Sequence, residues 1–123
     1  MGGIDQSAAV TAAIADHARL SYLYLDDGDL DAYGSLLADN VRLLRPDLPN
    51  VVGRARVLAE LAPIAGPPGR HRLYRVIADG DRVAAEGSYT GPWRTDVDFV
   101  DIMTFSADGL MLDQCRYYAT PIG

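Results

Sequence analysis

VDFVDIMTFSADGLMLDQCRYYA, residues 97–119, reads as two β-strands joined by a short turn. The pair Asp108-Gly109 is a strong hairpin signal. A turn with these two central residues makes 97–105 and 110–119 antiparallel neighbours, and a longer turn would shift their register. The expected cross-strand pairs are Phe105 with Leu112, Met103 with Gln114, Asp101 with Arg116, and Phe99 with Tyr118.

Asp101 is a carboxylate in an otherwise apolar row of the first of these strands. Alternate residues of a strand share a face, which places Phe99, Met103 and Phe105 beside it. The opposite row is also mixed, so the periodicity leaves open which face points inward. A carboxyl in apolar surroundings either stays protonated or ionises beside a cation, and both states suit proton transfer or oxyanion stabilisation. A structural ion pair with Arg116 on a solvated sheet face is the equal alternative.

The rest of the chain supplies three helices and further strands. Helices come first and strands dominate the second half, which is the order of an α+β domain. With 123 residues, the chain suits one domain over 1–123. The expected elements are a helix over 7–27 ended by Gly28, a helix capped by Asp29, a strand over 40–45, a helix over 54–61, and strands over 71–78, 82–90, 97–105 and 110–119. We therefore predict a cone-shaped single domain in which three N-terminal helices pack on a curved, mostly antiparallel sheet.

The first helix carries two tyrosines that are candidates for a site. Tyr22 and Tyr24 point from different sides of this helix, so at least one is expected to pack in the core. The residues expected on its buried face are Val10, Ile14, His17, Ser21 and Tyr24.

Composition excludes several kinds of chemistry. The net charge is −6, and such a surface repels phosphate backbones, so we expect no nucleic-acid partner. All eleven basic residues are arginine, which excludes a Schiff-base or pyridoxal-phosphate lysine. Cys115 is the only cysteine and there are two histidines, which excludes an internal disulfide, a multi-thiolate zinc site and a three-histidine metal site. We expect neither a metal nor a cofactor.

The sequence also gives an expectation about location. No apolar run approaches the ~18 residues that cross a bilayer. The N-terminus lacks a basic segment followed by an apolar one, so we expect no signal peptide and no membrane partner. The expected compartment is the cytoplasm.

Four further residues have both a functional and an ordinary interpretation. His71 opens a strand between two arginines, where a lone histidine is more often a surface or core residue than a base. Asp26 belongs to an acidic group around a helix end, where most members cap or solvate the turn. Glu86 is the only charge in a strand of small residues, and it faces either a pocket or a partner subunit. Trp93 follows Gly-Pro in a loop, as a lid or an interface anchor.

The hairpin over 97–119 resembles that of the ketosteroid isomerases, in which an Asp, an apolar residue and a Met precede an Arg/Thr-Phe pair and a turn ending in Gly. The pattern YLDDGDLDAYGSLLADNV, followed by Gly53-Arg54, is similar to the first two helices and the pocket-lining helix of the same superfamily. That superfamily comprises the nuclear transport factor 2-like and SnoaL-like proteins. The resemblance covers nearly the whole chain and implies the cone-shaped fold.

The same resemblance implies roles for particular residues. Asp101 falls on the isomerase's oxyanion-hole carboxylic acid, a carboxyl that is kept neutral in those enzymes. Tyr118 falls on an aromatic residue that lines the steroid pocket. The general-base Asp of the isomerases precedes a Pro, where this chain has Arg45. The oxyanion Tyr of the first helix aligns with Ser21, one position before Tyr22.

Two other comparisons concern charged pairs. SnoaL-like dehydratases of the scytalone type pair a helix-end Asp with a His that opens a strand, and Asp26 and His71 resemble that pair, with a first-helix tyrosine as hydroxyl donor. If the pair forms, the carboxylate should raise the pKa of His71, although burial opposes the rise. Limonene epoxide hydrolase sets an Arg between two strand carboxylates, which Asp101, Arg116 and Glu86 resemble loosely and in a different order.

These observations favour a cofactor-free cyclase, isomerase or dehydratase that uses acid–base catalysis on a small, apolar, oxygenated molecule of polyketide or terpenoid type. The alternatives are a non-catalytic ligand-binding or dimerisation domain and an epoxide-opening enzyme. A homodimer through the outer sheet face is expected, because both faces of 97–105 carry apolar residues. The expected catalytic residues are Asp101, His71, Asp26 and Arg116, and the expected substrate contacts are Tyr22, Tyr24, Glu86, Phe99, Met103, Tyr118 and Trp93.

Overall fold

The computed structural model describes residues 2–92 and 94–119. In this part of the chain three helices and six strands form an α+β fold, as predicted. No helix among the described residues is long and apolar enough to span a membrane. In chain order the elements are α1 (Gly2–Asp26), α2 (Leu30–Gly34), β1 (Leu37–Leu44), β2 (Val51–Val52), α3 (Arg54–Leu61), β3 (Arg70–Asp79), β4 (Arg82–Gly91), β5 (Arg94–Phe105) and β6 (Met111–Tyr118).

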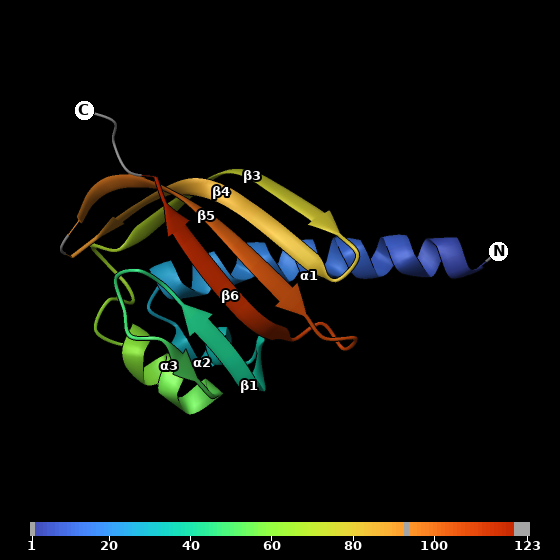
Figure 1. Ribbon diagram of the computed structural model, residues 1–123, viewed down its shortest axis with the longest axis horizontal. Helices are drawn as coiled ribbons and strands as arrows, with labels where there is room; N and C mark the ends of the chain where they lie inside the picture. Colours follow the sequence, from blue (N-terminus) through green and yellow to red (C-terminus); the bar gives the residue numbers. More distant parts are fainter. Residues whose placement is uncertain (1, 93, 120–123) are drawn as a thin grey trace.

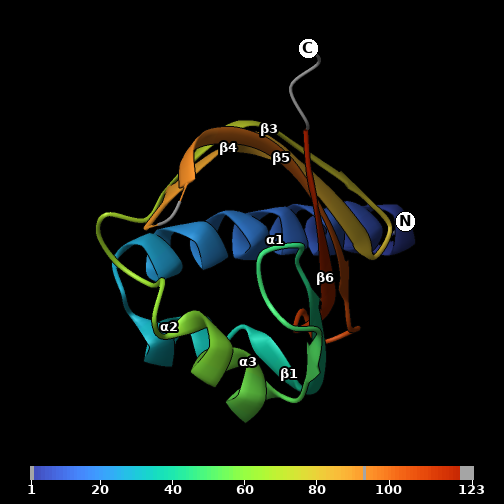
Figure 2. The ribbon, with the colours of Figure 1, turned by 60° about the vertical axis from the view of Figure 1, so that its left-hand side comes forward.

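The strands form one curved sheet in the order β2-β1-β6-β5-β4-β3. All neighbours are antiparallel except β1 and β6, which run parallel, so the sheet is mixed. The sheet arches over α1, and α2 and α3 lie below that helix beside β1 (Figures 1 and 2). The apolar core fills the space between the concave face of the sheet and the helices.

The β5–β6 hairpin has the predicted register over most of its length. Met103 pairs with Gln114, Asp101 with Arg116, and Phe99 with Tyr118. Phe105 pairs with Met111 and not with the predicted Leu112. The turn is longer than two residues, because the Ser106 amide donates to the Leu110 carbonyl at 2.7 Å and closes a loop over 107–109. An irregularity between Thr104 and Phe105 absorbs the extra residue, so the pairs beyond it keep the expected register.

The helix α1 starts earlier than the predicted residue 7 and buries a different face. Its first half passes the β3–β4 turn near Ala12 and extends beyond the sheet (Figure 1). Val10 is therefore 47% exposed, and its predicted inward position is wrong. Tyr24 is half-buried, whereas Tyr22 is buried. Over residues 8–26 of this helix, the buried residues are Ile14, Ala18, Ser21, Tyr22 and Leu25.

The segments between α1 and β3 largely follow the predictions. Gly28 has a φ of 76° and ends the first helix. The Asp29 side chain accepts a hydrogen bond from the Ala32 amide and caps α2. The third helix has the predicted bounds. The strand predicted over 40–45 starts earlier, at Leu37, and the expected loop after it contains the short β2, which pairs with β1.

Candidate active site

Asp26 is the last residue of α1, and hydrogen bonds connect the C-terminal end of this helix to the start of β3. The Gly66 amide donates to the Leu25 carbonyl at 2.8 Å, which brings the loop before β3 against the helix end. The His71 amide donates to Asp26 Oδ2 at 2.8 Å, and His71 Nδ1 lies 2.7 Å from Asp26 Oδ1. The helix-end Asp and the strand-opening His are therefore in direct contact through both backbone and side chain.

Asp101 lies at the centre of the concave face and is fully buried. Arg116 binds it side-on, with Nε 2.8 Å from Oδ1 and Nη2 2.7 Å from Oδ2. The Tyr22 hydroxyl donates to Oδ2 at 2.6 Å, and Gln114 Nε2 donates to the same oxygen at 2.9 Å. The row of β5 that contains Asp101 and Met103 thus points inward. Four donors on one buried carboxylate make it an anchor of the network.

Arg116 joins Asp101 to His71. Its Nη2 lies 3.0 Å from His71 Nε2 as well as 2.7 Å from Asp101 Oδ2. A guanidinium can only donate, so His71 Nε2 must accept this hydrogen bond. The proton of the imidazole is then on Nδ1, where it is donated to Asp26. His71 is therefore a neutral imidazole with one defined tautomer.

The charges in this network differ from two expectations. Burial opposes ionisation of Asp101, but the charge and hydrogen bonds of Arg116 prevail and lower the pKa of this carboxyl. Asp101 is thus a carboxylate, unlike the neutral acid that the isomerase resemblance implied. Burial is also the largest influence on His71, and with the Arg116 charge it outweighs Asp26 and lowers the His71 pKa. The expected rise in that pKa is wrong, because burial in the cone prevails over the single carboxylate.

A second polar cluster extends the network; sequence reasoning expected Tyr118 to line a pocket, but it gave Arg45 no role and missed the contact between them. Arg45 donates to the Asp47 carboxylate through Nε at 3.0 Å and Nη2 at 2.8 Å. The Tyr118 hydroxyl accepts from Arg45 Nη2 at 3.1 Å and from Arg116 Nη1 at 3.4 Å, and it donates to Asp47 Oδ2 at 3.2 Å. No local signal pointed to this cluster, because Arg45 and Asp47 lie in the turn after β1, and Tyr118 is brought beside them only by the parallel pairing of β1 with β6.

Aromatic rings surround these charged groups. The Arg116 guanidinium carbon lies 4.2 Å from the centre of the Phe99 ring, which is a close cation–π contact. Tyr89, which sequence reasoning also missed, has its ring centre 4.6 Å from that of His71, 5.2 Å from the Arg45 guanidinium and 5.3 Å from that of Arg116. Within the described part of the chain, every buried side-chain nitrogen and oxygen has a hydrogen-bond partner.

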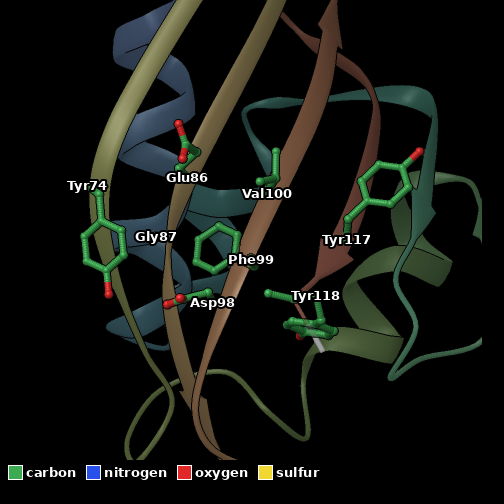
Figure 3. Close-up of a pocket in the computed structure, with 9 residues that line it drawn as sticks. Tyr74, Glu86, Gly87, Asp98, Phe99, Val100, Tyr117 and Tyr118 are labelled. Carbon is green, nitrogen blue, oxygen red and sulfur yellow. The ribbon is translucent and has the colours of Figure 1, made fainter. Parts of the chain in front are cut away.

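Two predicted contacts, Glu86 and Tyr24, are not part of this inner network. Glu86 lies on the outer face of the sheet, where its Oε1 is 3.4 Å from Arg75 Nε. It lines an open hollow of about 350 Å³ with Tyr74 and Tyr117 (Figure 3). Tyr24 packs at the edge of the core. Trp93 lies outside the described residues.

Among the described residues, no three His, Cys, Asp or Glu side chains are grouped so that they could hold a metal ion. The polar groups that do converge are suited to moving a proton. His71 has an acceptor nitrogen, and Arg116 and Tyr118 have donors that can stabilise negative charge. Asp26 holds His71 in place, and Asp101 holds Arg116.

A family model described as the SnoaL-like domain matches residues 18–114. No curated protein matches the chain by sequence. A candidate ketosteroid isomerase from Kribbella flavida is similar in structure, with a TM-score of 0.78 and 21% identity over 92% of this chain and 82% of that one. A candidate polyketide cyclase from Sinorhizobium meliloti has a TM-score of 0.73 and 14% identity over 83% and 94%. An NTF2-like protein of unknown function from Burkholderia pseudomallei has a TM-score of 0.75 and 22% identity over 87% and 91%.

Proposed function

The chain belongs to the SnoaL-like domain family, and on that premise we propose that it is a cofactor-free enzyme that transfers protons on a small, largely apolar, oxygenated molecule. The reaction class is isomerisation, cyclisation or dehydration. The observation that carries this proposal is the 3.0 Å contact between His71 Nε2 and Arg116 Nη2. It joins the Asp26–His71 pair and the Asp101–Arg116 pair into one network. Two of the similar structures, a candidate isomerase and a candidate polyketide cyclase, support the same class.

His71 is the proposed general base. Its lowered pKa keeps the ring neutral at neutral pH, which is the form that accepts a proton. Asp26 holds Nδ1 and leaves Nε2 as the basic nitrogen. The positive charge that forms on the ring during the reaction is stabilised by Asp26, since a carboxylate 2.7 Å away favours the imidazolium.

Arg116 and Tyr118 are the proposed donors to a developing oxyanion. Each already donates a hydrogen bond within the cluster, Arg116 to His71 and Tyr118 to Asp47, and would redirect that donor to the substrate oxygen. Asp101 has the role of holding Arg116, because its carboxylate is fully buried and bound by four donors. Steroid isomerisation by a carboxylate base is not proposed, because Arg45 occupies the position where the resemblance places that base.

An exchange assay tests this proposal without knowledge of the natural substrate. The protein is incubated in D₂O with small ketones, including β,γ-unsaturated cyclic ketones, and deuterium uptake at carbon is followed by NMR. We expect uptake on at least one ketone, and a loss of roughly 10²-fold or more in His71→Asn, as for removal of a general base. Glu86→Gln, on the outer sheet face, is the matched control and should retain the rate. Equal rates in wild type and His71→Asn would reject His71 as the base.

A ligand-binding domain without catalysis is the second candidate. It is favoured by one observation, the full hydrogen-bond satisfaction of the buried polar side chains in the described part of the chain. If that candidate holds, ketones would bind with shifts of the Tyr89 and Phe99 resonances, and none would exchange protons faster than in buffer. Epoxide opening is not pursued, because Glu86 lies on the opposite face of the sheet from Asp101 and Arg116.

A further inference from the structure

Three donors of the Arg116 guanidinium have a defined place between Asp101 and His71. The side-on contact with Asp101 uses Nε–H and one of the two Nη2–H groups. Two parallel hydrogen bonds of this kind fix the plane of the guanidinium. The second Nη2–H must then point away from Asp101, and His71 Nε2 lies on that side at 3.0 Å. The direction of the donor toward His71 is thus a consequence of the Asp101 contact.

We propose that Asp101 is a positioning residue that aims Arg116 at His71 Nε2, and that His71 accepts a proton only when Arg116 passes this hydrogen bond to an oxygen of the substrate. The inference rests on the proposed function, in which His71 is the base. Arg116 must redirect its hydrogen bond first, because Nε2 cannot hold a proton while the Arg116 donor lies 3.0 Å away.

The proposed step balances. A C–H bond next to a carbonyl breaks, its proton goes to His71 Nε2, and its electron pair forms an enolate on the substrate. The enolate oxygen then accepts the hydrogen bond from Nη2–H that Nε2 accepted before. Arg116 keeps all of its protons. The substrate class is therefore an enolisable ketone or ester, whose α-carbon can lie beside His71 Nε2 while its oxygen lies within hydrogen-bonding reach of Arg116.

The surroundings of His71 make its titration a direct readout of this arrangement. The charged and titratable groups around it are Asp26 and Tyr22 on α1, Tyr89 on β4, Asp101 on β5 and Arg116 on β6. Arg116 is the nearest cation and lowers the His71 pKa, whereas the Asp101 charge raises that pKa by a smaller amount. The second histidine, His17, lies at another place, where its Nδ1 is 2.7 Å from the Gly109 carbonyl. His17 therefore provides an internal reference in every spectrum.

The test is an NMR titration of both histidines in wild type and in the double variant Asp101→Asn with Arg116→Gln, which removes both buried charges together. We expect the His71 midpoint to rise by about one unit or more, a tenfold gain in proton affinity, because the lost Arg116 charge lowers this pKa more than the lost Asp101 charge raises it, and Asp26 remains. An unchanged or lower His71 midpoint would overturn the inference.

A second measurement on the wild type covers the case in which the double variant does not fold. A scalar coupling between ¹⁵N nuclei across the hydrogen bond should link Arg116 Nη2 and His71 Nε2 above the His71 midpoint and vanish below it. Absence of the coupling at high pH, with Arg116 Nη2 signals in fast solvent exchange, would also overturn the inference. Neither measurement needs a substrate. If both succeed while His71→Asn keeps its exchange activity, the proposed function fails and the positioning of Arg116 stands.

Discussion

The charged residues inside the cone differ in how deeply they are buried. Asp101 and Arg116 are almost completely buried and pair with each other, whereas Asp26 and Asp47 keep about a fifth of their side chains exposed. Taking a charge pair out of water is costly, and only full hydrogen bonding offsets that cost. Asp101 meets this condition with four donors, which explains how an ion pair persists among Phe99 and other apolar neighbours.

Asp101→Asn should destabilise the protein by about 3–5 kcal/mol, because Arg116 would be left as a buried charge without its partner. The catalytic role expected from the sequence predicts that this substitution lowers activity far more than stability, whereas the fully buried pair predicts a large loss of stability as well. Urea unfolding measures this loss. The double variant with Arg116→Gln should lose less than the single variant, as expected for coupled residues. A single variant within 1 kcal/mol of wild type, on the order of an ordinary surface substitution, would contradict the account.

The lowered pKa of His71 makes stability depend on pH with a definite sign. The unfolded chain binds a proton at His71 near the free pKa of about 6.5, and the folded protein binds it only at lower pH. This contribution to stability is therefore complete above the free pKa and is lost as pH falls through the folded pKa. Unfolding free energies measured between about pH 7.5 and 5 should fall more steeply in wild type than in His71→Asn. Parallel pH profiles would show that His71 is not held in its neutral form.

At the scale of elements, the β5–β6 hairpin could be predicted because its register depends on local counting. The alternation around Asp101 and a turn at Gly109 placed Arg116 opposite Asp101, and the irregularity between Thr104 and Phe105 preserved this pairing although the turn is longer than expected. The contact between Asp26 and His71 could be proposed only from a resemblance, since no local pattern joins the end of α1 to the start of β3. The cluster of Arg45 and Tyr118 was missed for the same reason, because β1 and β6 meet only through the parallel pairing.

The direction in which the His71 pKa shifts could not be predicted from the sequence, for a different reason. Asp26 was visible as a neighbour that raises this pKa, but the depth of burial and the nearby Arg116 depend on how the whole cone closes. The face of α1 was mispredicted because its hydrophobic spacing continues to Val10, beyond the point where the sheet covers the helix.

The packing of β4 against β3 depends on Gly87. A Cβ atom there would overlap the Arg72 carbonyl at the irregular pairing between Leu73 and Arg75. Gly87→Ala should therefore cost about 1–3 kcal/mol, the usual penalty for overpacking, as measured by chemical denaturation. In the matched control Gly34→Ala, the new methyl would meet only the flexible end of the Leu58 side chain, at 3.1 Å. A loss in Gly34→Ala as large as that in Gly87→Ala would contradict this account.

For the whole molecule, the outer face of the sheet is the expected homodimer interface. Tyr74 is 61% exposed, Ile77 53% and Tyr117 59%, and the strands β3 and β6 carry them. Apolar side chains gathered on one exposed face favour association. Sedimentation at micromolar concentration should give a dimer, and Tyr117→Arg should shift it toward the monomer. The matched control is Leu23→Arg, which changes an equally exposed apolar residue on α1. A wild-type monomer would count against the interface.

The central claim is that the fold closes around one connected network in which His71 is a neutral base between Asp26 and Arg116. The most direct test is the ¹⁵N NMR spectrum of the His71 ring in the wild-type protein at pH 7. The account predicts a protonated Nδ1 and an unprotonated Nε2, because Asp26 accepts at one nitrogen and Arg116 donates to the other. A ring protonated on both nitrogens, or on Nε2 alone, would contradict it.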